Sequence, residues 1–339
     1  MKVLFSSNKN PNFLTITEYI EKAFKKVKCT TLYFDNRSFL FPGQMRDRMP
    51  YLNKLDIKWM NNRLISTIKS FTPDLFLEAG GHRILPETIV KIKELGVKTA
   101  LWTIDPPREF EHIIKVAPLY EFVFTGGSEA YKILSDFGVK NLFWLPFACD
   151  PDFHKPQTLT ASEKRLYKCD VAFVGSIHPE LYPFRVKILE KISDLNLGVW
   201  GPGAEKISVS SLLKKRIRGN KTTPDVWTKI YSQAKIVLCM HYKDPEEKIP
   251  CYQASPRVYE ALACGSFLMV DEQSDVKKIF KDRKDLVIFR DANELKTLIS
   301  YYLNRTEKRK TIAASGREKV LQKHTYEHRI KDLLKVVSQ

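Results

Sequence analysis

The strongest constraint on the fold is an alternation of short, uniformly apolar runs with longer segments of helical periodicity. Runs such as VLF, LFL and FVF are apolar at consecutive positions, which is typical of strands buried on both faces of a parallel sheet. The segments between them have the length and spacing of amphipathic helices, so the pattern predicts a doubly wound α/β domain. In the first half we expect strands at residues 2–6, 30–34, 74–77, 98–102, 122–125 and 141–145.

The same alternation restarts in the second half, with strands expected at residues 170–175, 197–200, 235–240, 266–270 and 286–289. A chain of 339 residues is long for one core and suits two domains. We therefore predict two Rossmann-like doubly wound domains facing each other across a cleft, where ligands bind outside the carboxyl ends of the strands. The expected division is an N-terminal domain at 1–148, a proline-bearing polar linker at 149–168, a C-terminal domain at 169–318 and a helical tail at 319–339.

Composition narrows the class of protein. No stretch approaches the roughly 20 apolar residues of a membrane-spanning helix. The N-terminal apolar run is too short for the core of a signal peptide, so we expect a cytoplasmic protein. The six cysteines form no C-x-x-C pair and the seven histidines show no H-E-x-x-H spacing, which leaves a metal site without support.

The net charge of +17 favours anionic partners. Nucleotide phosphates need only part of this excess, and the rest is explained either by a basic solvated surface or by a polyanion or anionic lipid. For contact with the inner face of a membrane, the sequence points to the basic cluster at residues 214–218 and to the charged tail. Nucleic-acid motifs are missing, as are the G-x-G-x-x-G and G-x-x-x-x-G-K-[ST] fingerprints of dinucleotide and P-loop sites.

The most informative segment for chemistry is residues 255–265, SPRVYEALACG. Ser255 is placed as an N-cap, Pro256 as the first helical residue and Gly265 as the C-terminal stop. A helix N-terminus presents free N–H groups and a positive dipole end, which suit a phosphate. Arg257 adds a positive charge in the first turn, and Glu260 follows on the same face, where its carboxylate can accept both hydroxyl hydrogens of a ribose. An ordinary amphipathic helix with an Arg–Glu surface pair is the alternative.

This segment, continued as SPRVYEALACGSFLMVDE, resembles the donor-site helix of GT-B glycosyltransferases. It is most similar to the branch of the group 1 enzymes that includes the spore-maturation protein CgeB, with the pattern R-x-F-E-A-x-A-C-G-x-x-L-x-x-D. Three further stretches resemble that family and occur in its order: LWTIDPP in the first domain, WLPFACDPDFHKP at the hinge and DVAFVGS at the start of the second domain.

The resemblance implies a metal-independent glycosyltransferase that needs no cofactor and uses a nucleotide-diphosphate sugar as co-substrate. It implies that Glu260 binds the donor ribose, that Arg257 and the backbone at Ser255 hold the diphosphate, and that Gly175 and Ser176 form the loop under the donor. Of the two stereochemical outcomes it favours retention. Many retaining GT-B enzymes place another glutamate eight positions before the ribose-binding one, where this chain has Tyr252, so the sugar-facing contact is unassigned.

The first domain is expected to bind the acceptor. Its cleft loops follow two buried strands, with Gly80, Gly81 and His82 after the first and Gly126 and Gly127 after the second. Asp105 follows another strand and precedes two prolines, which hold it in a rigid turn. Transfer to a hydroxyl needs at most one base, and Asp105 and His82 are our catalytic candidates. A turn-capping aspartate and a hydrogen-bonded loop histidine are the structural alternatives for the two.

Sugar transfer from a nucleotide-diphosphate sugar to a hydroxyl of a glycan, lipid-linked or protein acceptor is the function that these observations favour. Two alternatives remain open. One is a two-domain protein that closes on a small ligand without reacting, and the other is a nucleic-acid-directed glycosyltransferase acting on modified DNA, for which steeply salt-dependent DNA binding is the signature.

Overall fold

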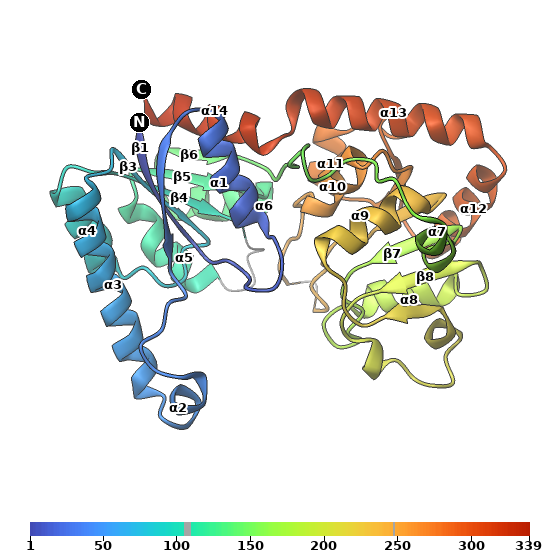
Figure 1. The fold of residues 1–339 in the computed structure, drawn as a ribbon, viewed down its shortest axis with the longest axis horizontal. Coiled ribbons are helices and arrows are strands. Elements are labelled where there is room, and N and C mark those ends of the chain that lie inside the picture. Colours follow the sequence, from blue (N-terminus) through green and yellow to red (C-terminus); the bar gives the residue numbers. More distant parts are fainter. Residues whose placement is uncertain (105–109, 247) are drawn as a thin grey trace. The chain divides into compact units, whose positions relative to one another are not determined.

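The structure, a computed structural model, describes residues 1–104, 110–246 and 248–339. The chain forms two compact units (Figure 1), one made of residues 1–146 with 326–339 and the other of residues 147–325. Each unit contains a six-stranded parallel sheet with helices on its faces, which confirms the predicted α/β class.

The sheet of the first unit has the strand order β2-β1-β3-β4-β5-β6. Its central strands are buried almost throughout, as expected from their uniformly apolar sequences. The strands are β1 Lys2–Ser7, β2 Thr30–Asp35, β3 Leu75–Ala79, β4 Lys98–Thr103, β5 Phe122–Thr125 and β6 Leu142–Trp144. The helices are α1 Ile16–Lys26, α2 Gly43–Arg48, α3 Tyr51–Phe71, α4 Pro86–Glu94, α5 Phe110–Val116, η2 Ala117–Leu119, α6 Ser128–Asp136 and α14 Tyr326–Val337.

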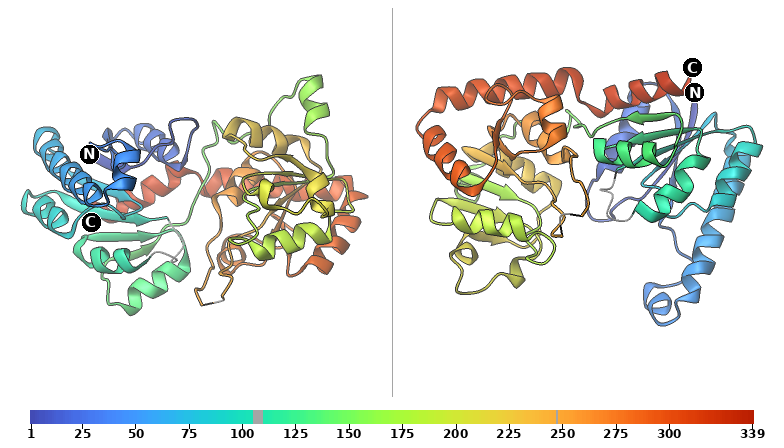
Figure 2. Two further views of the ribbon diagram at one scale, coloured as in Figure 1. Left: turned by 90° about the horizontal axis from the view of Figure 1, so that it is seen from below. Right: turned by 180° about the vertical axis from the view of Figure 1, so that it is seen from behind.

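The C-terminal helix α14 belongs to this first unit, although it follows the whole of the second unit in sequence. It packs beside α1, as both figures show (Figures 1 and 2), and the rings of Tyr19 and Tyr326 stack with centroids 6.1 Å apart. Arg329 donates to the carbonyl oxygen of Pro146 at 2.7 Å. The end of the chain is therefore part of the first core rather than a separate tail after the second domain.

The sheet of the second unit has the order β12-β11-β10-β7-β8-β9. Its strands are β7 Val171–Val174, β8 Leu197–Trp200, β9 Ile217–Gly219, β10 Ile236–Cys239, β11 Leu268–Asp271 and β12 Val287–Phe289. Its helices are α7 Ala161–Leu166, α8 Pro183–Lys191, η3 Ala204–Lys206, η4 Leu212–Arg216, α9 Pro224–Gln233, α10 Pro256–Ala263, α11 Ser274–Ile279, α12 Ala292–Leu303 and α13 Thr306–Lys323. The basic cluster at residues 214–218 is divided between the end of η4 and the start of the edge strand β9.

The boundary between the units lies between Pro146 and Phe147, so residues 149–168, which we expected to be a linker, lie within the second unit. They are ordered by local contacts. The backbone N–H of Cys149 donates to the carbonyl oxygen of His324 at 3.0 Å, and Thr160 caps α7 in a capping box with Glu163. No helix among the described residues is long and apolar enough to cross a membrane.

Candidate functional site

The candidate site of the second unit lies where four neighbouring parallel strands end. Strands β11, β10, β7 and β8 are adjacent in the sheet, so their carboxyl ends share one edge. The loops after them begin with Glu272, Met240, Gly175 and Gly201 respectively, and His241 is the second residue of the loop after β10. Helix α10 connects β10 to β11, so its N-terminus starts from the same edge.

Two of these loops pack backbone against backbone at glycines. Gly201 has φ +152°, and a methyl group on it would lie 1.9 Å from the carbonyl oxygen of Gly175. Gly203 has φ +93°, and a methyl group there would lie 2.4 Å from the backbone nitrogen of His178. Only glycine fits both the positive φ and the close approach. The loop that contains Gly175 and Ser176 is thus supported directly by the loop after β8.

The buried side chain of Arg185, on α8, holds two of the loops in place. Its guanidinium donates to the carbonyl oxygens of Ser176 and Met240, each at 2.7 Å. Burial, together with the charge of Arg257, lowers the pKa of Arg185 to about 10. Arg185 therefore positions the loops after β7 and β10, and Arg257 lies close enough for the two positive charges to interact.

Helix α10 begins as its sequence predicted. The Ser255 side chain caps the helix by accepting from the backbone N–H of Arg257 at 3.4 Å, and Pro256 is the first helical residue. Gly265 follows the helix in the left-handed region, with φ +77°. The guanidinium of Arg257 is partly exposed and makes no hydrogen bond or ion pair with the residues that the structure describes. This leaves a positive charge in the first turn available to an anion.

Glu260 is buried one turn further along the same helix. Burial raises the pKa of its carboxyl group to about 7, although the positive charge of Arg257 acts to lower it. The imidazole Nε2 of His154 lies 3.9 Å from Glu260 Oε1. His154 Nδ1 accepts from the backbone N–H of Asp150 at 3.0 Å, so the neutral ring carries its proton on Nε2, facing the carboxylate. Glu260 is thus a buried carboxyl that titrates near neutral pH.

A second buried pair lies at the ends of β10 and β11. Asp271 Oδ1 accepts from both the backbone N–H of His241, at 2.9 Å, and its ring Nδ1, at 2.6 Å. Burial acts to raise the pKa of Asp271, but the charge and hydrogen bonds of His241 outweigh it and hold the pKa below its ordinary value. The other ring nitrogen, Nε2, is buried and has no hydrogen-bond partner among the described residues. Asp271 therefore orients an imidazole that still has a nitrogen to offer a ligand.

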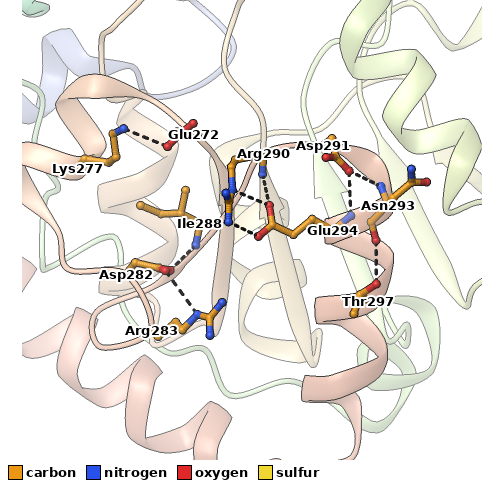
Figure 3. Close-up of polar contacts among 10 residues, drawn as sticks. All are labelled: Glu272, Lys277, Asp282, Arg283, Ile288, Arg290, Asp291, Asn293, Glu294 and Thr297. Carbon is orange, nitrogen blue, oxygen red and sulfur yellow. Dashed lines mark hydrogen bonds and ion pairs between the residues drawn. The ribbon is translucent and has the colours of Figure 1, made fainter.

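Two other cations near this edge, Arg290 and Lys277, are already paired, as Figure 3 shows. Arg290 follows β12 and makes a two-pronged contact with Glu294, at 3.1 Å and 3.2 Å, while Asp291 caps α12. Lys277 pairs with Glu272 at 3.0 Å. Arg257 differs from these two side chains because no carboxylate among the described residues contacts it directly.

A pocket of about 450 Å³ lies beside these groups in the second unit. Tyr252, which stands eight positions before Glu260, is part of its wall and is partly exposed. Lys243, Asp244 and Glu272 also line it, so the pocket is polar and holds charges of both signs. These side chains can face a sugar. The sequence pattern did not predict the two acidic residues, Asp244 and Glu272, as part of the site.

In the first unit, a pocket of about 310 Å³ lies at the carboxyl ends of β1 and β3. It is lined by three of the predicted residues, Gly80, Gly81 and His82. Beneath it, Glu78 is fully buried and its Oε1 accepts from the side-chain amide of Asn36 at 2.8 Å. Burial raises the pKa of Glu78 to about 7, although hydrogen bonds and the charge of His82 act to lower it.

The remaining predicted residues of this unit lie elsewhere or are not described. Gly126 and Gly127 follow β5 and are not among the residues that line this pocket. Gly127 instead precedes α6, where a methyl group on it would collide with the side chain of Glu129 at 2.4 Å. Asp105 lies outside the described residues. Within the described residues, no group of three or more His, Cys, Asp or Glu side chains is arranged to hold a metal ion.

Several residues of the two sites were not predicted from the sequence. Three of them are buried charged side chains on helices or strands whose sequences give no sign of a site, namely Arg185, Glu78 and Asp271. Glu78 and Asp271 could have been found from the sequence only as carboxylates at the end of an apolar run. For His154 the only indication was its position in a proline-bearing segment. What brings them to the sites is the packing of strands that are distant in the sequence.

A family model described as glycosyl transferase-like matches residues 185–335, which include α10, all but the first two residues of α8 and most of the second unit. The matched residues are less than half of the chain, and the match shows that this part is similar to glycosyl transferases. No curated protein matches the chain.

Solved structures match the whole chain. Sucrose-phosphate synthase of Thermosynechococcus elongatus is 10% identical, with a TM-score of 0.70 over 100% of this chain and 98% of the other. Anabaena HepE in complex with UDP-glucose is 12% identical, with a TM-score of 0.68 over 100% and 99%. Trehalose-6-phosphate synthase OtsA is 10% identical, with a TM-score of 0.71 over 100% and 99%. At these identities the similarity shows the fold, which is the two-domain GT-B architecture expected from the sequence.

Proposed function

We propose that this protein is a glycosyltransferase that moves a sugar from a nucleotide-diphosphate sugar to a hydroxyl group of an acceptor. The observation that carries the proposal is the arrangement on α10 of Arg257, an unneutralised cation in the first turn, and Glu260, a buried carboxyl one turn further. The glycosyl transferase-like match contains this helix, which supports the same reading.

Each group has a role in this proposal. Arg257 and the backbone N–H groups at the start of α10 hold the diphosphate and stabilise the negative charge that develops as it leaves. The loop at Gly175 and Ser176, supported by Gly201, lets the donor approach backbone atoms. Glu260 accepts hydrogen bonds from the two ribose hydroxyl groups. His241, oriented by Asp271, offers Nε2 to the donor sugar or phosphate.

The first donor to test is a uridine diphosphate sugar, because HepE was solved with UDP-glucose. In the first unit we propose that the pocket at Gly80 and Gly81 receives the acceptor and that His82 takes the proton from its hydroxyl group. Asp105 remains the second candidate for that role. Because Glu78 titrates near neutral pH beneath the pocket, it can tune the charge of His82.

Binding of UDP to the purified protein, followed by calorimetry, tests the donor site. Arg257→Ala removes a charge-assisted contact of about 2 kcal/mol, so we expect about thirty-fold weaker binding. Arg290→Ala is the matched control, because that guanidinium already pairs with Glu294 at the same sheet edge. Unchanged UDP affinity in both Arg257→Ala and Glu260→Ala would show that this helix is not the donor site.

Turnover separates an enzyme from a binding protein. Incubation with UDP-glucose should release UDP, slowly by hydrolysis and faster once an acceptor is supplied, whereas a non-catalytic binder returns the nucleotide sugar intact. Loss of this activity in Arg257→Ala, with the fold retained, is the expected result. Binding to DNA that falls steeply with salt would instead favour the nucleic-acid-directed alternative.

Three finer points belong to the same proposal. We propose that the leaving group is stabilised by protein groups without an essential metal ion, so a chelator should leave the rate unchanged. We propose retention at the anomeric carbon, which NMR of the first product formed would report. We also propose the CgeB-like branch of the group 1 enzymes, on the strength of the SPRVYEALACGSFLMVDE stretch.

A further inference from the structure

Residues 37–58 of the first unit form a helical hairpin at one end of the long helix α3. Figure 1 and the right-hand view of Figure 2 show α2 beside the first turns of α3, away from the sheet. The second half of α3 packs into the core through Met60, Leu64 and Ile68. The first half extends beyond that core, and none of the residues of α2 is buried.

The hairpin exposes a concentration of large apolar side chains. Single exposed apolar residues are common on any protein surface, but clusters of them mark contact sites. The most exposed is Tyr51, at 60%. The exposed apolar side chains of the hairpin are Phe39, Leu40, Met45, Met49, Tyr51 and Leu55.

The hairpin is held in shape by a buried carboxylate. Asp56 Oδ1 accepts from the backbone N–H groups of Leu40, at 2.7 Å, and Phe41, at 3.2 Å. Its other oxygen lies 3.4 Å from Nε of Arg46, whose guanidinium stacks over the ring of Phe39 at 3.6 Å. The apolar side chains therefore project from a braced framework, and the exposure is a property of the folded hairpin.

The exposed charges between these apolar side chains are mostly positive. Arg37, Arg48, Lys54 and Lys58 are exposed, and Asp47 is the exposed acidic residue of the hairpin. Arg48, Lys54 and Lys58 make no ion pair with a described residue. An apolar surface interspersed with free cations is complementary to an anionic lipid surface, which offers phosphates at the level of the cations and acyl chains below them.

We propose that the hairpin at residues 37–58 is the surface by which this protein docks on membranes that contain anionic lipid. The apolar side chains enter the boundary between headgroups and acyl chains, and the cations remain among the phosphates. The basic cluster at residues 214–218 is less suited to this role, because three of its side chains are hydrogen-bonded to backbone carbonyl groups of the same unit. Lys214, Arg216 and Arg218 donate to the carbonyl oxygens of Ala204, Ser193 and Lys168.

Co-sedimentation with vesicles tests the proposal without donor or acceptor, so it can fail while glycosyl transfer stands, and the reverse also holds. The probes are vesicles of phosphatidylcholine alone and of equal parts phosphatidylcholine and phosphatidylglycerol. We expect binding to the mixed vesicles only. Each Lys or Arg near an anionic surface contributes about five-fold, equivalent to ~1 kcal/mol, so Arg48→Gln with Lys54→Gln should weaken binding about 25-fold.

A second variant removes apolar surface and keeps the charge. Met45→Asn with Tyr51→Asn should weaken binding to the mixed vesicles at least about ten-fold, because both side chains are exposed and leave the lipid boundary. The matched controls are Phe137→Asn and Lys132→Gln with Lys140→Gln, which change exposed side chains elsewhere in the same unit and should leave binding unchanged. All of the substituted side chains are exposed, so each variant should have the same thermal unfolding temperature as the parent protein.

Three outcomes would overturn the proposal. The first is the absence of binding to mixed vesicles, and the second is equal loss in the control variants. The third is a concentration-dependent dimer that the Met45→Asn with Tyr51→Asn variant converts to a monomer while vesicle binding is unchanged, which would assign the hairpin to contact between copies of this chain.

Discussion

Replacing Glu260 by glutamine should stabilise the second unit at alkaline pH and leave its stability near pH 5 almost unchanged. The carboxyl group is buried, and burial raises its pKa to about 7 from an ordinary value of 4.5, even with Arg257 nearby. The folded protein therefore binds this proton more tightly than the unfolded chain does. Stability from this group is lost as the pH rises from about 4.5 to about 7, because the unfolded chain releases the proton first.

The magnitude follows from the difference between the two pKa values. A gap of about 2.5 pKa units, from about 7 minus 4.5, corresponds to about 3 kcal/mol at pH 8. Near pH 5 the folded protein keeps the proton and the unfolded chain has only begun to gain free energy by releasing it, so the contribution falls below about 1 kcal/mol. Glutamine has the shape of the protonated carboxyl group and cannot ionise, so the variant does not lose stability as the pH rises.

Thermal unfolding of the parent protein and of Glu260→Gln, each at pH 5 and pH 8, measures the effect. We expect the variant to unfold roughly 5–10 °C higher than the parent at pH 8, with a much smaller difference at pH 5. The same variant should bind UDP at least about ten-fold more weakly, because an amide accepts at only one of its two positions. A stability difference between variant and parent that is the same at pH 5 and pH 8 would show that the pKa of Glu260 is not raised by burial.

One further prediction concerns ligand binding by the same carboxyl group, and two concern other residues. The affinity for UDP should rise between pH 6 and pH 8 as Glu260 ionises and accepts the ribose hydroxyl groups, and calorimetry should find this rise missing in Glu260→Gln. Glu78→Gln should stabilise the first unit by about 3 kcal/mol at pH 8 but not at pH 5, since burial raises the pKa of Glu78 to about 7; a urea midpoint shifted equally at both pH values would contradict this. Gly201→Ala should destabilise the second unit by more than about 3 kcal/mol, because the methyl group would meet the carbonyl oxygen of Gly175 at 1.9 Å. Gly96→Ala is its control: φ is +75° but nothing lies within 4 Å, so only about 1 kcal/mol is expected, and equal losses would argue against the close approach.

Local signals in the sequence predicted most of the secondary structure. The helix expected from Ser255, Pro256 and Gly265 has the predicted cap, first residue and terminating glycine, because these signals act within a turn of the helix end. The uniformly apolar runs became the buried strands of two parallel sheets, because only a strand covered on both faces tolerates them. The short edge strand β9 was missed, since its sequence is basic and only half-buried.

Of the candidate site, the sequence alone determined Arg257, Glu260 and the glycine loops, whose spacing is local, and the GT-B fold that the alternation and the resemblance predicted. The tertiary structure decided the rest. It brought Arg185 to the carbonyl oxygen of Met240, which is 55 residues away in the sequence. It also placed Asp271 against His241 and His154 beside Glu260, and each of these pairs is separated by 30 residues or more. It also returned α14 to the first unit. Such partners depend on which strands become neighbours and on which carboxylates lose their water, and both are set by packing between distant segments, which leaves no short-range pattern to read.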